Sequence, residues 1–317
     1  MSAAQHLIVP YADAAGLEAS RSAVAGQLHA LQRLLARLHA GPALTGDAQN
    51  LSPPHERARA RALGLTDADG AIPWAAWEHA SSGQAPGDAA WAWISPCHWH
   101  VAQDHVQMHP LETLQLDAPA SQELLAAVAP YFREDGIELS LLTPTRWLAR
   151  GEIFRGLACA SLDRVCGRRV DDWLPRAQAA RPLRRLQQEM QMLLYTHPVN
   201  EAREQAGLRP VNSFWVSGAG ALPLPPGPAA PVRVDARLRG PALAGQPEAW
   251  TEAWRALDAQ VMPALLDAAQ RGQHVTLTLC GERHARTWST HSPSAAWWQR
   301  AARLLRPPAV AAILETL

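Results

Sequence analysis

The chain has 317 residues, 48% of them hydrophobic, and its 29 basic side chains balance 29 acidic ones. This length and apolar content allow a large core or a core with a second lobe, whereas zero formal charge gives no general attraction to nucleic acid or anionic lipid. With only four cysteines, no secretion signal and no apolar run of ~18 residues, the sequence predicts a reduced, cytoplasmic protein without nucleic-acid or membrane partners.

The first part of the chain alternates between strand and helix signals, which is typical of an α/β core. A short apolar run before Pro10 predicts a buried first strand. Leucines at helical spacing then predict amphipathic helices. The expected ranges are a strand at 7–9, helices at 23–38, 52–63 and 74–79, and a polar loop at 81–88 that is the first candidate domain boundary.

The middle of the chain has a different pattern, in which aromatic and β-branched residues alternate with polar ones and predict strands. Together with two amphipathic helices, these strands predict a compact α+β lobe over residues 89–195. The expected strands are at 91–94, 99–101, 106–108, 137–142 and 146–150, and the helices at 120–132 and 183–195.

The last part returns to strand and helix alternation. Expected strands lie at 232–234 and 275–279, and expected helices at 248–269 and 295–305. The sequence therefore predicts an α/β fold with a discontinuous core of residues 1–88 and 196–317, interrupted by the inserted α+β lobe of residues 89–195.

A glycine pair follows the most strongly aromatic strand signal of the chain. Residues 210–217 predict a buried strand, and Gly218-Ala219-Gly220 predicts a tight loop at its end, where α/β sheets usually place ligands. The polar groups near this loop could bind a small anion, or could hydrogen-bond backbone that would otherwise be unpaired. The candidate binding residues are His197, Asn200, Arg203, Asn212, Gly218 and Gly220.

The densest polar cluster lies between residues 97 and 109. Imidazole and thiolate groups are ligands for zinc and copper, and His98 and His100 would share one face of a strand. The alternative is a partly exposed strand with hydrogen-bonded imidazoles. A divalent metal such as zinc is the one cofactor to which the sequence points. The candidate ligands are Cys97, His98, His100, His105 and His109.

Two further features have an ordinary and a functional interpretation. Arg181, Arg184 and Arg185 could bind a phosphate or carboxylate, or could be neutralised by neighbouring acids. Thirteen tryptophans, several in pairs at helical spacing, predict large core anchors.

Three parts of the chain together resemble one group of proteins. They are residues 193–200 with 212–220, the middle lobe from Asp104 to the strand at Ile137, and the terminal frame of residues 7–10 and 276–281. The chain is similar along its length to RpfE-type bacterial regulatory proteins, and in patches to archaeal-type cofactor-independent phosphoglycerate mutases. The resemblance implies an alkaline-phosphatase-like sheet core flanked by helices.

The resemblance also implies what the active site of a mutase would need. Those mutases use two metal ions and a serine nucleophile, and their first strand ends in a metal-binding Asp-Gly. Here Pro10-Tyr11 takes that place, and proline offers no ligand atom for a hard cation. The candidates for relocated ligands are Asp13, Glu282 and His284.

Three functions therefore remain open. The leading one is a non-catalytic, mutase-like protein with a regulatory or binding role, whose partner is a small anion or another protein. The second is a metal-dependent phosphotransfer enzyme with relocated ligands, and the third is a metal-binding protein that uses the cluster of residues 97–109.

Overall fold

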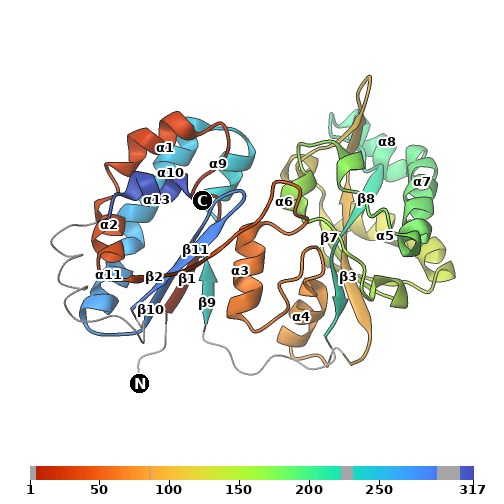
Figure 1. Cartoon of the computed structure of the whole chain (residues 1–317). Helices are drawn as coiled ribbons and strands as arrows, with labels where there is room; N and C mark the ends of the chain where they lie inside the picture. Colours follow the sequence, from red (N-terminus) through yellow and green to blue (C-terminus); the bar gives the residue numbers. More distant parts are fainter. Residues whose placement is uncertain (1–4, 86, 223–230, 291–307) are drawn as a thin grey trace. The chain divides into compact units, whose positions relative to one another are not determined.

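The computed structural model describes residues 5–85, 87–222, 231–290 and 308–317. The chain divides into two compact units (Figure 1), the first formed by residues 1–49, 53–64 and 226–317 and the second by residues 50–52 and 65–225. The second unit is larger than the predicted lobe of residues 89–195. Residues 65–88 and 196–225 also belong to it, for a reason that its sheet explains below.

The first unit is built on a five-stranded sheet in the order β2-β11-β10-β1-β9 (Figure 1). Strand β1 (Gln5–Val9) lies parallel to β10 (Val275–Cys280) and to β9 (Val232–Val234). Strands β11 (Ala285–Ser289) and β2 (His39–Leu44) continue the sheet antiparallel. The chain therefore pairs its first strand with segments from its last third.

Alternation along β1 divides the core of the first unit between the two faces of the sheet. Leu7 and Val9 lie in a large cluster with the apolar stripes of five helices, whereas Ile8 lies in a smaller cluster with Ala58 of α3. This alternation is the period of two that a strand imposes. The helices of the larger cluster are α1 (Glu18–Ala25), α2 (His29–Leu35), α10 (Pro247–Gln260), α11 (Met262–Gln270) and α13 (Val310–Glu315), with α9 (Arg239–Leu243) beside α10 and α3 (Pro54–Ala62) on the opposite face.

Several predicted elements of this unit differ from the observed ones. The single helix expected at 23–38 is two helices with Gly26 at the break, because glycine is a poor helix former. The helix expected at 248–269 is also two helices, and Pro263 lies in the first turn of the second, where proline is tolerated. Strands β2 and β11 were not predicted; β2 contains Pro42 and is an edge strand, as its proline requires. The helix expected at 295–305 lies outside the described residues.

The second unit contains a four-stranded antiparallel sheet in the order β6-β7-β3-β8. Its strands are β3 (Ala90–Cys97), β6 (Glu138–Thr143), β7 (Arg146–Arg150) and β8 (Ser213–Ala221). Helices α5 (Ala118–Glu134) and α7 (Arg181–Tyr195) pack on one face, where the rings of Phe132 and Phe214 lie 5.0 Å apart. Because β8 pairs with β3 along its length, residues after 195 belong to this unit.

The opposite face of this sheet contacts α4 (Trp74–Ser81), which packs on β3 and β8 and so places residues 65–88 in the second unit. A hairpin of β4 (Trp99–Val101) and β5 (Val106–Met108) follows β3. The remaining helical segments are η1 (Leu111–Leu114), η2 (Glu152–Phe154), α6 (Leu162–Val165), η3 (Val170–Asp172), η4 (Gln178–Ala180) and α8 (Pro198–Gln205).

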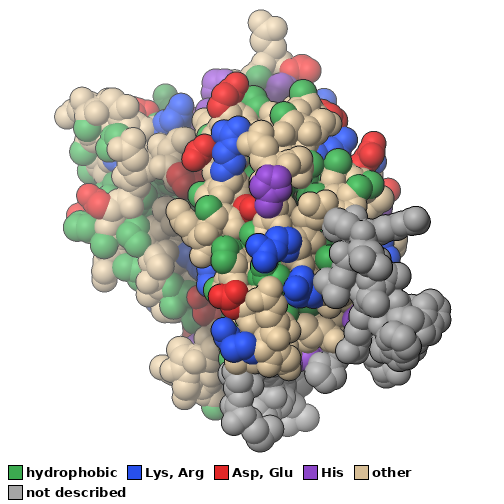
Figure 2. Space-filling view, turned by 90° about the vertical axis from the view of Figure 1, so that its left-hand side faces the viewer, with side chains coloured by type: hydrophobic (Ala, Val, Ile, Leu, Met, Phe, Trp, Pro, Cys, Tyr) green, Lys and Arg blue, Asp and Glu red, His purple; other side chains and the backbone are tan. Residues whose placement is uncertain are grey.

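The predicted fold class is confirmed: the protein is α/β, with sheets flanked by helices. The predicted tryptophan anchors are confirmed at Trp215, Trp250 and Trp254, which are at most 1% exposed. Trp77, Trp91 and Trp93 are only partly buried, and Trp297 and Trp298 lie outside the described residues. On the face shown in Figure 2, acidic and basic side chains are interspersed. Within the described ranges, no helix combines the length and the hydropathy that crossing a bilayer requires.

Candidate functional site

Hydrogen bonds from other parts of the first unit hold the backbone of the loop after β1. The indole Nε1–H of Trp250 donates to the Tyr11 carbonyl at 2.9 Å, and that of Trp254 donates to the Ala12 carbonyl at 3.3 Å. The Ala12 amide donates to the Cys280 carbonyl at 2.7 Å. The carbonyls of Tyr11 and Ala12 and the amide of Ala12 therefore all have hydrogen-bond partners within the protein.

Tyr11 has a left-handed backbone, with φ of 56°. A bulky residue in this conformation is strained, and here the hydrogen bonds to its own carbonyl and to Ala12, with the burial of its side chain, hold it in place. Its ring lies 5.7 Å from that of His55. The loop thus has a conformation that glycine adopts easily, although tyrosine occupies the position.

The three candidates for relocated metal ligands each have a partner nearby. Both carboxylate oxygens of Asp13 accept from Arg21 at 3.1 Å. Burial raises the pKa of Asp13, and the Arg21 charge opposes that shift. Glu282 accepts from the Ala15 amide at 3.4 Å, and His284 Nδ1 accepts from the Gly46 amide at 3.3 Å.

The glycine pair does not form the predicted loop. Gly218 and Gly220 lie inside β8, next to a register shift in its pairing with β3. A Cβ on Gly218 would lie 2.9 Å from Cε3 of Trp93, and one on Gly220 would lie 2.9 Å from Cβ of Pro73. Positive φ values, 62° and 151°, also favour glycine at both positions. These glycines allow close packing within the second unit, and the expected ligand loop is replaced by a continuing strand.

The polar residues expected around that loop bond to backbone. His197 caps α8 by accepting from the Val199 amide at 3.2 Å. Asn200 is 2% exposed and both donates to and accepts from Val211. Arg203 donates to the Arg209 carbonyl at 3.0 Å and to the Leu114 carbonyl. The structure thus gives His197, Asn200 and Arg203 the backbone-pairing arrangement, the second of the two interpretations left open by the sequence.

Asn212 has a different neighbour from the one the sequence suggested. Its Oδ1 accepts from the Trp99 amide at 2.7 Å, and its Nδ2 donates to the Trp99 carbonyl at 2.8 Å. Both backbone groups of Trp99 are therefore held by one side chain. Since Trp99 separates His98 from His100, Asn212 anchors the backbone of the histidine cluster.

Two arginines of the basic stretch on α7 form ion pairs or hydrogen bonds with nearby groups. Arg185 pairs with both oxygens of Asp135 at 2.6 Å and with Glu189 at 3.3 Å. Arg184 donates to the Pro175 carbonyl at 2.5 Å. Arg185 is therefore neutralised by acidic side chains, but its closest partner, Asp135, lies 50 positions earlier in the sequence.

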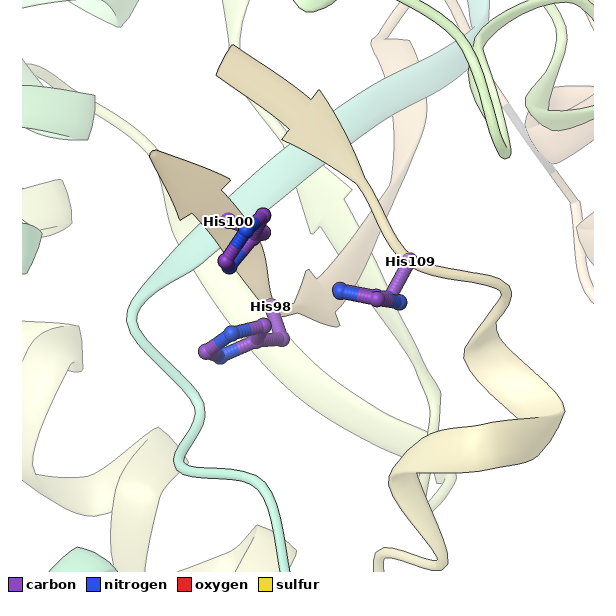
Figure 3. Close-up of side chains that lie close together, drawn as sticks. All are labelled: His98, His100 and His109. Carbon is purple, nitrogen blue, oxygen red and sulfur yellow. The ribbon is translucent and has the colours of Figure 1, made fainter. Parts of the chain in front are cut away.

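Three of the five candidate metal ligands come together. One ligand atom from each of His98, His100 and His109 lies within 4.8 Å of the others, and Figure 3 shows the three rings close together. The ring centroids of His98 and His100 lie 5.4 and 5.7 Å from that of His109. We call these residues the histidine cluster.

The other two candidates lie away from the histidine cluster. Cys97 is fully buried in an apolar group with Trp99 and Met108, and burial raises the pKa of its thiol. His105 is in the turn between β4 and β5, where its Nδ1 is 2.7 Å from Asp104. Cys97 points to the face opposite that of His98, because successive residues of a strand point to opposite faces. His105 is excluded because it lies in the turn at the far end of the hairpin.

The electrostatic surroundings favour neutral imidazoles at His98 and His109. Partial burial lowers the pKa of His98 and of His109, and the Arg209 charge acts in the same direction on both. His98 Nδ1 donates to the Pro210 carbonyl at 2.9 Å. Sequence reasoning missed Arg209 and Pro210, because nothing in their local pattern links them to a hairpin about a hundred positions earlier.

Comparison with known proteins gives similarity over a limited part of the chain. No family model matches it. A 2,3-bisphosphoglycerate-independent phosphoglycerate mutase of Methanothrix thermoacetophila is 33% identical over 75 residues, which are 24% of this chain and 19% of the relative. The enzyme of the same name from Methanosarcina acetivorans is 38% identical over 65 residues, 20% of this chain and 16% of the relative. The chain thus matches less than a fifth of the length of these curated relatives.

Two solved structures align with most of the chain at low similarity. The cofactor-independent phosphoglycerate mutase from Thermoplasma acidophilum has a TM-score of 0.37 and 13% identity, covering 93% of this chain and 91% of that one. The PH0037 protein from Pyrococcus horikoshii has a TM-score of 0.47 and 10% identity, covering 91% and 87%. The protein is therefore similar, over a segment of 65 to 75 residues, to phosphoglycerate mutases of the cofactor-independent type.

Proposed function

We propose that this protein is a phosphoglycerate-mutase-like protein that does not transfer phosphoryl groups and acts by binding, in a regulatory role. Similarity to curated mutases supports the relation to that enzyme class. The observation that carries the loss of chemistry is the loop after β1. The resemblance to those mutases puts Pro10 in the place of an acidic metal ligand, and Trp250 and Trp254 hold the next two carbonyls.

The donor set does not fit a pair of divalent cations. Two-metal phosphoryl transfer needs several hard oxygen donors gathered around both ions. At this edge of the sheet, Asp13 is bound to Arg21, and Asp235 after β9 pairs with Arg233 and Arg237. In the described ranges, groups of three close donors occur at the histidine cluster alone, which lies in the second unit. We therefore derive no catalytic step through metal ions here.

Relocated ligands are the rival explanation, and the structure argues against them. Moving Asp13 onto a cation would leave the partly buried Arg21 without its partner, which costs free energy. Glu282 and His284 each bond to a backbone amide instead of to one another.

Enzyme assays test this proposal directly. Purified protein is incubated with 3-phosphoglycerate, and separately with a general phosphatase substrate, in the presence of Mn²⁺, Co²⁺, Zn²⁺ or Mg²⁺. We expect no turnover above the blank. Turnover that a chelator abolishes would overturn the proposal, and its loss in Asp13→Asn would assign it to relocated ligands.

The binding role needs its own measurement. The RpfE-type resemblance suggests a regulatory role whose ligand is a small anion or a protein. Native mass spectrometry of the untagged protein should detect such a bound species, with a mass above that of the chain. A protein that shows neither species, and whose melting temperature does not respond to phosphate or 3-phosphoglycerate, would contradict this part of the proposal.

A further inference from the structure

We propose that His98, His100 and His109 bind one divalent transition-metal ion, Zn²⁺ first among them, as a three-imidazole site with an open fourth position. This inference goes beyond the proposed function and does not depend on it. It concerns the second unit alone, and a metal held there would act independently of the loop after β1.

The hairpin geometry brings the three ligands together. His98 immediately precedes β4, His100 lies within it, and His109 immediately follows β5. The His109 amide donates to the His98 carbonyl at 3.0 Å, so these two residues are opposite one another across the hairpin. His98 and His100 are two residues apart and share a face. All three rings therefore project from one side of a short ribbon (Figure 3).

The other side of the same ribbon is anchored in apolar packing. Trp99 and Met108 are paired in the hairpin register and are both buried. They lie in one cluster with Trp215 of β8. Asn212 binds both backbone groups of Trp99. The backbone that carries the histidines is thus held from behind, which limits the cost of ordering a metal site.

One ring is already oriented for binding. His98 Nδ1–H donates to the Pro210 carbonyl at 2.9 Å, so the tautomer it fixes leaves a lone pair on Nε2. Metal-bound histidines commonly use their second nitrogen in this way. Among the described residues, the ring nitrogens of His100 and His109 have no protein hydrogen-bond partner, so binding a metal would break no protein hydrogen bond there.

Ligand type and spacing select the metal. Tetrahedral zinc with bonds of about 2.0 Å places its nitrogens about 3.3 Å apart. The observed atoms lie within 4.8 Å of one another, so small side-chain rotations close the site. Imidazoles favour zinc, copper and nickel over magnesium or calcium. Three protein ligands leave one position for water or a small anion, whereas structural zinc sites are usually closed by four.

The test is metal titration of the untagged, full-length protein. Apo protein is titrated with Zn²⁺ against a competing chelator, and the bound metal is counted by elemental analysis. We expect one ion per chain, and a loss of affinity of at least about 100-fold in His98→Ala and in His109→Ala, because a direct ligand contributes more than its supporting groups. Co²⁺ substitution should give the absorption spectrum of a four- or five-coordinate nitrogen site.

A matched control lies in the same hairpin. His105→Ala removes an imidazole from the turn that is paired with Asp104, and it should leave zinc affinity unchanged. Wild-type protein that binds no zinc, or histidine-cluster variants that still bind it as tightly, would overturn the proposal. Circular dichroism and denaturation midpoints identify any variant that has lost its fold, and His100→Gln provides a second, milder exchange.

The two proposals can fail separately. Mutase or phosphatase turnover that persists in His98→Ala would overturn the non-catalytic proposal and leave the zinc site standing. A protein that binds no zinc and shows no turnover would overturn the zinc site and leave the non-catalytic proposal standing.

Discussion

The loop after β1 and the histidine cluster both gather polar groups next to a strand, but these groups have different partners. In the loop, Trp250, Trp254 and Arg21 bind the available carbonyls and the one carboxylate. In the histidine cluster, His98 bonds to backbone through one nitrogen only. The difference teaches that polar residues indicate a binding site only when their hydrogen-bonding capacity is not already used by the fold.

The largest loss of stability is expected from a substitution that removes support from the loop after β1. Trp250→Ala removes a fully buried indole and leaves the Tyr11 carbonyl without its donor. We expect a loss of about 3 to 5 kcal/mol in unfolding free energy, measured by urea denaturation. Trp250→Phe keeps most of the apolar contact and should cost clearly less. Both variants lose the indole donor, so equal losses would show that the hydrogen bond, and not the apolar contact, accounts for the effect.

The sheet that supports this loop should respond to pH through His6. Its Nε2 lies 2.9 Å from Thr278 Oγ1, and burial, with a smaller contribution from His274, lowers the pKa of His6 to about 4. Between pH 4 and pH 6.5, His6 is more protonated in the unfolded chain, where its pKa is about 6.5, than in the folded protein. Stability is therefore complete above pH 6.5 and is lost as pH falls towards 4.

The expected loss is about 2 to 3 kcal/mol, measured from urea midpoints at pH 7.5, 5.5 and 4.5. His6→Gln should flatten this profile, because an amide does not titrate. The exposed His29→Gln exchange is the control. A profile that is unchanged in His6→Gln would contradict the assignment.

Substitutions at three glycines separate the cost of close packing at Gly218 from the cost of backbone strain. Gly218→Ala introduces a Cβ at a positive φ and against Trp93, and should cost about 1 to 3 kcal/mol. Gly16→Ala has the positive φ with nothing within 4 Å, so it reports strain alone. Gly240→Ala has neither and should cost nothing. A Gly218 variant as stable as the Gly240 variant would show that close packing does not explain this glycine.

The smallest effect concerns support of the histidine cluster. Asn212→Ala releases both backbone groups of Trp99 while leaving all three histidines in place. We expect zinc affinity to fall about 10-fold, measured by the same chelator competition. Gln187→Ala is the matched control, because Gln187 donates to the Phe214 carbonyl of β8 and not to Trp99. Weakening of zinc binding by both variants would indicate a general loss of order.

The sequence was most informative where local patterns decide structure. The apolar run before Pro10 and the alternation in residues 275–279 correctly predicted two strands that pair with each other. The helix of residues 120–132 was also found, within two residues at each end. Gly26 and Pro263 could have indicated the helix breaks, but the apolar periodicity continues on either side of them, and we predicted single helices.

The site was predictable only in part. Residues 98, 100 and 109 could be proposed as ligands from their types. The exclusion of Cys97 depends on the face that its side chain occupies, and the exclusion of His105 depends on its place in the turn of the hairpin. The role of Gly218 depended on Trp93 and Trp74, which lie far away in sequence. Asn212 likewise acts on Trp99, 113 positions earlier. Such long-range contacts leave no trace in local spacing.

The pairing of β1 has a consequence for how the protein is made. Its neighbours, β9 and β10, are translated more than two hundred residues later. The four strands of the second sheet all come from residues 90–221, so that sheet can assemble on the ribosome first. Until β9 and β10 are made, the apolar Leu7-Ile8-Val9 run has neither of its neighbouring strands, so we expect it to be exposed during synthesis.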